Sequence, residues 1–239
     1  MNSFSSFALV CSISLLLFKS QCFGQEKHPD LAQHQEAEQE LKQQEHQRIL
    51  GIVPEFNASN LQHAARLSPA EKLHLAFKSA TDPFTLVAAG LDAGLNQWED
   101  DFAGYGQGGE GYGKRLGAAY ADNLSGTMLG NALFPILLHQ DPRYFRKGTG
   151  PVISRAFYAG MSTIRCKGDN GKWQPNYSNI LGNLAAGGIA NLYYPEADRG
   201  AALTFQRGVT VSLTGVIGAE IYEFWPDISR KLAHRKHKS

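Results

Sequence analysis

Cysteine is nearly absent from this chain, which has 3 in 239 residues. Cys11 and Cys22 lie in a segment that we predict to be removed on export, so Cys166 is the one cysteine of the expected mature chain. A single cysteine forms no internal disulfide, and stability must therefore come from packing. Cys166 stands between Arg165 and Lys167 with no histidine nearby in the sequence, which favours an incidental thiol over a catalytic nucleophile.

A surplus of charge of one sign is also lacking. The chain holds 23 Lys and Arg against 22 Asp and Glu, which argues against a nucleic-acid partner, because such a partner needs a basic surface. His, Cys and carboxylate residues do not occur at the spacings of metal sites, and the sequence matches no well-specified catalytic pattern. We therefore expect no metal and no cofactor.

An apolar run long enough to span a membrane is missing at the N-terminus. Residues 7–18 form an apolar stretch of 12, short of the ~20 residues that a spanning helix needs. Cys22-Phe23-Gly24 then offers small residues at the positions favoured before a cleavage site. The pattern predicts a signal peptide over residues 1–24 and export to the periplasm or outer envelope. An uncleaved membrane anchor is the alternative.

Charge is unevenly placed along the rest of the chain. Residues 25–48 are rich in Gln, Glu and His with almost no large apolar side chain, which predicts a polar linker or a solvated helix. Residues 230–239 hold five Lys and Arg, a basic tail that suits anionic lipid headgroups or is simply a solvated, frayed terminus. Residues 49–229 remain for one folded helical domain.

Helix signals dominate that domain. Ser68-Pro69-Ala70-Glu71 combines an N-cap serine, a proline at the first helical position and a glutamate that completes a capping box. Leu73 and Phe77 then repeat at helical spacing. A second helix is predicted from Pro83 to about Trp98.

Small residues recur about every four positions in three later segments. They are Gly113, Gly117 and Ala121 with Gly126 and Gly130; Gly182, Ala186 and Ala190; and Gly208, Ser212, Gly215 and Ala219. Such spacing lets helix backbones approach each other closely. The sequence therefore predicts a mainly α fold, a compact bundle of about five to six helices with Gly/Ala contacts.

Two segments need a choice between structures. The glycine-dense residues 104–113 invite comparison with phosphate-binding loops, but they follow a predicted helix and lack the Gly-Lys-Ser/Thr ending, so we predict a flexible turn. Residues 203–214 alternate apolar and polar, as a half-buried strand would, with Arg207 on the apolar side. The same segment also places Val209, Leu213 and Ile217 on one helical face, and we predict helix.

The polar site with most chemical promise lies between His139 and Arg146. His139 is a candidate general base, Asp141 a carboxylate able to orient it, and Arg143 and Arg146 are candidate anion-binding groups. Asp122 is a further candidate binding residue. The carboxylates that could join them are Glu220, Glu223 and Asp227. In the structural alternative, His139 caps a helix C-terminus, Asp141-Pro142 starts the next turn and the arginines pair with acids.

Three strings of the sequence are distinctive together: GYGKRLGAAYAD (111–122), LLHQDPRYFRKGTG (137–150) and EFWPDI (223–228). They resemble those of a group of uncharacterised exported helical proteins of acidobacteria-type bacteria, and the likeness covers residues 48–231. No activity is attached to that group. The resemblance therefore implies a bacterial envelope protein and carries over no site residues.

Two functions stay open on these grounds. One is an exported envelope protein, a structural or binding helical bundle associated with a membrane surface or anionic lipid. The other is an envelope hydrolase or lipid-modifying enzyme that uses His139, Asp141 and Arg143. The uncharged residues 123–140 and 173–195 suit either a membrane or a polar cavity in a bundle. A pocket that joins His139 to Asp141 favours the enzyme, whereas side chains that only cap helices favour the bundle.

Overall fold

The computed structural model describes residues 39, 48–49, 53–54, 58–59 and 64–236. The predicted signal peptide, nearly all of the predicted linker and residues 237–239 of the basic tail lie outside the described residues. The described part is mainly helical, with 71% helix and six helices in a compact arrangement. The predicted fold class is therefore confirmed.

The helices follow one another with short connections. In chain order they are α3 (Pro69–Ala80), α4 (Pro83–Trp98), η1 (Ala103–Tyr105), α5 (Gly108–Met128), the π-helical turn η2 (Leu129–Leu133), α6 (Phe134–Leu137), α7 (Val152–Gly160), η3 (Met161–Thr163), α8 (Tyr177–Ala190), η4 (Glu196–Asp198) and α9 (Ala201–Lys236). Because α5, η2 and α6 run on without a break, they form a single long helix with one wider turn near its C-terminal end.

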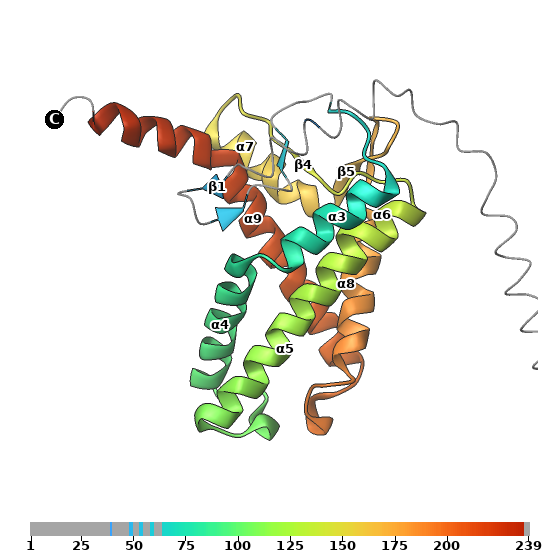
Figure 1. The fold of residues 1–239 in the computed structure, drawn as a ribbon, viewed down its shortest axis with the longest axis vertical. Coiled ribbons are helices and arrows are strands. Elements are labelled where there is room, and N and C mark those ends of the chain that lie inside the picture. Colours follow the sequence, from blue (N-terminus) through green and yellow to red (C-terminus); the bar gives the residue numbers. More distant parts are fainter. Residues whose placement is uncertain (1–38, 40–47, 50–52, 55–57, 60–63, 237–239) are drawn as a thin grey trace, which may run out of the picture.

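Three pairs of very short strands lie at one end of the molecule. Strands β1 (Arg48–Ile49) and β2 (Val53–Pro54) are antiparallel, as are β5 (Arg165–Lys167) and β6 (Trp173–Pro175). Strand β3 (Ala58–Ser59) pairs in parallel with β4 (Tyr144–Phe145). Figure 1 shows α7 and these strands gathered at one end, while the α4–α5 and α8–α9 connections lie at the opposite end.

The helix starts agree with the sequence signals. Ser68 accepts a hydrogen bond from the N–H of Glu71 at 3.3 Å, and the Ser68 N–H donates to the Glu71 carboxylate at 2.7 Å, which completes the predicted capping box. Asp82 caps α4 by accepting from the N–H of Phe84 at 2.8 Å. Helix α4 has the predicted bounds. Residues 203–214 are helical within α9, so that prediction is also confirmed.

Close backbone contact is found along only part of the predicted small-residue seams. A Cβ atom added to Gly182 would lie 2.5 Å from the Cα of Gly130, so α8 and η2 meet backbone to backbone. Gly113 and Gly117 have open space beside them, and the first seam is therefore wrong in its N-terminal half.

The glycine-dense segment is also more ordered than predicted. Helix α5 begins at Gly108 and takes up the second half of the segment. Only Gly106 and Gly108 need the left-handed backbone that glycine permits, with φ of 77° and 75°. In the part of the chain that the structure describes, no helix is both long and apolar enough to cross a membrane.

Candidate functional site

His139 lies at the end of α6, where it takes the left-handed conformation with φ of 53°. Its side chain is 73% exposed, with Nδ1 3.8 Å from a carboxylate oxygen of Asp169. Its carbonyl oxygen accepts a hydrogen bond from the N–H of Asp169 at 2.8 Å. The position therefore ends a helix and fastens the 168–171 turn to it.

Asp141 is buried and is paired with Arg143, two positions further along the chain. Its carboxylate accepts hydrogen bonds from the Arg143 N–H and Nε at 3.0 Å and from Arg143 Nη2 at 2.7 Å. Arg143 Nη2 also donates to the carbonyl oxygen of Ala65 at 2.6 Å. Among the described residues, no hydrogen bond or ion pair joins Asp141 to His139. The base and orienting carboxylate that the sequence suggests are thus not assembled as a pair.

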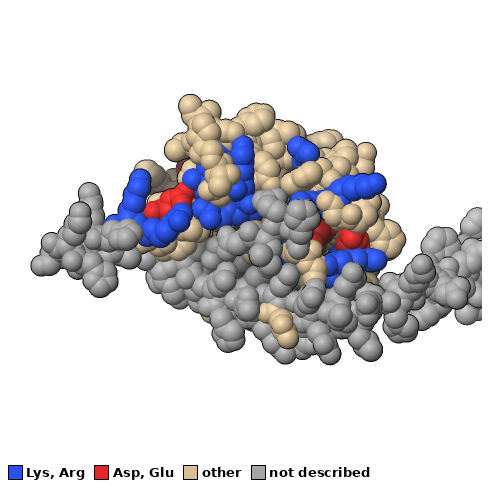
Figure 2. Space-filling view, turned by 90° about the horizontal axis from the view of Figure 1, so that it is seen from above, with Lys and Arg blue, Asp and Glu red and all other residues tan. Residues whose placement is uncertain are grey.

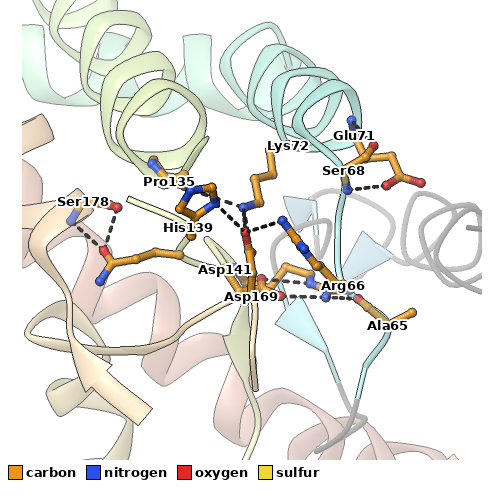
Figure 3. A network of polar contacts seen from close by, with 12 residues as sticks. Ala65, Arg66, Ser68, Glu71, Lys72, Pro135, His139, Asp141, Asp169 and Ser178 are labelled. Atoms are coloured by element: carbon orange, nitrogen blue, oxygen red, sulfur yellow. Dashed lines mark hydrogen bonds and ion pairs between the residues drawn. The ribbon is translucent and has the colours of Figure 1, made fainter. Parts of the chain in front are cut away.

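Lys72 and Asp169 form a buried ion pair beside these residues that the sequence analysis missed. Lys72 is 1% exposed and donates from Nζ to both oxygens of Asp169, at 2.7 and 2.9 Å. Figure 3 shows Lys72, Arg66 and His139 pointing toward Asp169 from separate parts of the chain. Because 97 positions separate Lys72 from Asp169, no local pattern could have revealed the pair.

Arg146 does not join Arg143 in an anion site. It donates from Nε to the carbonyl oxygen of Glu223 on α9 at 2.9 Å. The Glu223 carboxylate is fully buried and accepts from Arg155 Nε and the Tyr144 hydroxyl, both at 2.7 Å, and from two backbone N–H groups of residues 147–148. Burial alone would raise the pKa of Glu223, but these hydrogen bonds outweigh it and hold the pKa below its ordinary value.

Asp122 belongs to a different cluster, in the helical part of the molecule. Its carboxylate accepts from the hydroxyls of Tyr193 and Tyr194, at 2.6 and 2.7 Å, and from Arg207 Nε at 2.8 Å. Burial, first of all, and the nearby Asp122 raise the pKa of both tyrosines. Arg207 had given a signal in the sequence, since it stands on the apolar side of its segment. The two tyrosines had given none.

Every strong acid and base in these clusters already has a partner of opposite charge. The structure therefore separates the predicted site residues into three buried networks, centred on Asp141, Glu223 and Asp122, and leaves His139 at the surface beside Asp169. Buried networks of this kind fix the relative positions of helices and loops. They do not assemble a nucleophile, a base and an orienting group.

The thiol of Cys166 agrees with this structural assignment. Burial, together with the nearby Asp141, raises the pKa of the Cys166 thiol to about 12, so the thiol stays protonated at neutral pH. Within the described residues, no group of three or more His, Cys, Asp or Glu side chains is placed to hold a metal ion.

Large apolar side chains lie on the outside of the bundle. We call the following residues of α4, α7, α8 and α9 the apolar outer surface: Leu86, Val87, Leu91, Leu95, Val152, Ile153, Phe157, Ile180, Leu181, Ile189, Phe205, Val209, Leu213, Ile217 and Ile221. Leu73 and Phe77 of α3 are exposed as well. These helices thus bury mainly alanine, polar and charged side chains and turn most of their large aliphatic side chains outward, with Leu75 and Leu203 as buried exceptions.

The two ends of the bundle differ in charge. Residues 140–174, which we call the basic end, contain seven Lys and Arg against two Asp. Viewed onto that end, Figure 2 shows blue Lys and Arg atoms grouped over the described surface with few red ones between them. Residues 99–114, at the opposite end of Figure 1, contain four Asp and Glu against one Lys. The apolar outer surface lies mostly between them.

Comparison of the chain with protein-family models, with curated proteins and with solved structures finds no match in any of the three.

Proposed function

We propose that this chain is an exported cell-envelope protein, a structural or binding helical bundle that associates with a membrane surface. Its apolar outer surface contacts acyl chains, and its basic end contacts anionic lipid headgroups. The observation that carries the proposal is the inverted distribution of side chains between the interior and the surface.

The inversion is large both at the surface and in the interior. Leu91 and Leu213 are 68% and 58% exposed, whereas Lys72, Arg115 and Arg207 are each at most 5% exposed. A protein surrounded by water normally buries its large aliphatic residues and leaves Lys and Arg outside. Monomeric proteins rarely expose contiguous apolar patches of this kind unless the patch meets a partner or a membrane.

The placement of the apolar residues favours lipid over a single protein partner. They occur on the outward sides of four helices, α4, α7, α8 and α9, whereas one docked protein covers one face. Lipid acyl chains can cover all of these sides together. The exposed Arg165 and Lys172 of the basic end add an attraction to anionic headgroups, worth ~1 kcal/mol for each such charge near the membrane surface.

Sedimentation of the purified chain with lipid vesicles tests the proposal. We expect the protein to sediment with neutral phosphatidylcholine vesicles, and more of it with vesicles that contain phosphatidylglycerol. High salt should remove only the additional, electrostatic part, because salt screens charge but not apolar contact. A chain that stays in the supernatant with both kinds of vesicle would refute membrane association.

The double variant Val209→Ser with Leu213→Ser tests the apolar outer surface directly. Burial of one such side chain contributes about 1.5–3 kcal/mol, so the double variant should partition into neutral vesicles at least about tenfold more weakly. Thr210→Ser, at a half-buried position on the same helix, is the matched control and should partition like the parent chain. Equal partitioning of all three proteins would mean that this part of α9 does not contact the lipid.

A further inference from the structure

A cavity of about 490 Å³ lies inside the bundle, a volume typical of sites for small molecules. Its walls come from α4, α5, η2, α8 and α9, and the loops of the basic end close it at one side. Neither of the proposed catalytic residues offers a base in this cavity. His139 is not among its lining residues, and Asp141 is paired with Arg143.

One wall of the cavity is a stripe of neutral polar side chains. Asn123, Thr127 and Asn131 stand four residues apart on α5 and η2, and all three line the cavity. Asn123 donates to the carbonyl oxygen of Ala119 at 2.9 Å, which leaves its own amide oxygen available as an acceptor. The side chains of Thr127 and Asn131 make no hydrogen bond within the part of the chain that the structure describes.

A second wall, on α9, is mainly apolar. Helix α9 contributes small and aliphatic residues to the lining, among them Val211, Gly215 and Ile217. Trp173 and Tyr158, with ring centroids 6.0 Å apart, add aromatic surface. A ligand that satisfies both walls has hydrogen-bonding groups on one side and hydrocarbon on the other.

The charged residues of the cavity lining are Asp141, Arg143 and Arg165, and none of them stands on the polar stripe. Arg143 forms a two-point ion pair with Asp141 in the wall itself. The guanidinium of Arg165 lies over the ring of Trp173, 4.6 Å from its centroid, at an exposed position. The polar stripe of α5 and η2 carries amide and hydroxyl groups only, which pair with hydroxyls, esters and other neutral polar groups.

The mouth of the cavity lies on the apolar outer surface. Ile217 and Ile221 line the cavity and are nevertheless 62% and 38% exposed, so the cavity opens along this stretch of α9. A molecule entering here would come from the acyl-chain region, if the apolar outer surface contacts lipid.

We propose that the cavity binds an uncharged single-chain lipid of the monoacylglycerol type. Its hydroxyl and ester groups meet Asn123, Thr127 and Asn131, and its hydrocarbon chain lies against α9. The inference rests on the proposed function only for the source of the ligand, because the cavity and its walls are independent of membrane contact.

The test uses fluorescence quenching by a brominated monoacylglycerol, delivered from cyclodextrin to the full chain without vesicles. The chain has three Trp, so Trp98→Phe with Trp225→Phe leaves Trp173 in the cavity wall as the reporter. We expect saturable quenching at one lipid per chain. Absence of saturable quenching would overturn the proposal.

Two variants in the same background test the polar stripe. Thr127→Val with Asn131→Leu removes two hydrogen-bonding side chains at similar size and should weaken binding at least about tenfold. Thr210→Val, which lies outside the cavity lining, is the matched control and should bind like the background. Unchanged binding by the stripe variant would refute the assigned orientation. If circular dichroism shows that the stripe variant is unfolded, Ala88→Phe, which fills the cavity from α4, replaces it with the same expectation.

The class of ligand is tested with a brominated fatty acid of the same chain length. Its carboxylate has no counter-ion on the polar stripe, so we expect at least about tenfold weaker binding than for the monoacylglycerol. Equal or tighter binding of the fatty acid would overturn the uncharged class. A chain that binds monoacylglycerol but fails to sediment with vesicles would refute the proposed function alone, and the reverse result would refute the cavity alone.

Discussion

The helical half of the molecule, made of α4, α5, α8 and the first half of α9, differs from the basic end in how its parts are joined. In the helical half, backbones meet at small residues such as Gly130 and Gly182, and a single buried ion pair, Asp122 with Arg207, is described between α5 and α9. In the basic end, loops are attached to α9 through the buried carboxylate of Glu223 and the guanidinium of Arg155. Packing of small residues is sensitive to added volume, whereas a buried ion pair is sensitive to the loss of one partner.

The largest effect is expected from Arg155→Leu. The substitution leaves Glu223 fully buried without its guanidinium partner, and loss of one member of a buried pair typically costs about 3–5 kcal/mol. Denaturant unfolding should show that loss in the free energy of unfolding. Arg230→Leu removes a pair to Asp227 from a side chain that is 68% exposed, and it should change the free energy by less than about 1 kcal/mol. Similar losses for both variants would mean that the buried ion pair of the basic end contributes no more to stability than an exposed one.

A smaller effect, confined to the helical half, is expected from Gly182→Ala. The new methyl group would lie 2.5 Å from the Cα of Gly130, so α8 and η2 must separate, at a cost of about 1–3 kcal/mol. Gly188→Ala is the matched control on the same helix, because nothing lies within 4 Å of its added Cβ. That control should stabilise the protein by up to about 1 kcal/mol through helix propensity. The same unfolding measurement serves for both, and equal stability of the two variants would deny the backbone contact.

Acid should weaken the basic end by less than the loss of Arg155 does. The pKa of Glu223 is lowered in the folded protein from an ordinary value of 4.5. The stabilisation from this shift is therefore present above pH 4.5 and is lost as the pH falls from there through the folded pKa. The free energy of unfolding should fall as the pH is lowered from 7 to 3. Glu223→Gln should make this fall less steep.

Glu220→Gln is the control for that slope. Burial and the charge of Glu223 raise the pKa of Glu220, so this group favours folding when protonated, and its contribution runs in the opposite direction with pH. Removing its charge should therefore make the acid-dependent loss steeper. A slope that is the same in the parent and in Glu223→Gln would show that other carboxylates govern acid unfolding.

The comparison also explains what the sequence could reveal. The capping box at Ser68, the bounds of α4 and the small-residue seam that includes Gly182 followed from local patterns, because their residues stand close together along the chain. Contacts of the basic end join residues 68 and 97 positions apart, as in Arg155 with Glu223 and Lys72 with Asp169. A periodic pattern also does not tell which face of a helix points inward, so the outward direction of Leu73 and Phe77 had to come from the structure.

His139 lies at the junction of the two regions, and His139→Gly should give the smallest effect. A side chain at φ of 53° is strained by roughly 1 kcal/mol relative to glycine. Its ring is largely exposed, and its 3.8 Å contact with Asp169 therefore contributes little to the free energy of unfolding. We therefore expect His139→Gly to raise the free energy of unfolding by about 0.5 kcal/mol, and His139→Ala, which keeps the strain, to change it by less. A clear loss of stability in His139→Gly would mean that the imidazole fastens the 168–171 turn more strongly than its exposure indicates, and the basic end would then depend on a surface contact as well as on its buried pairs.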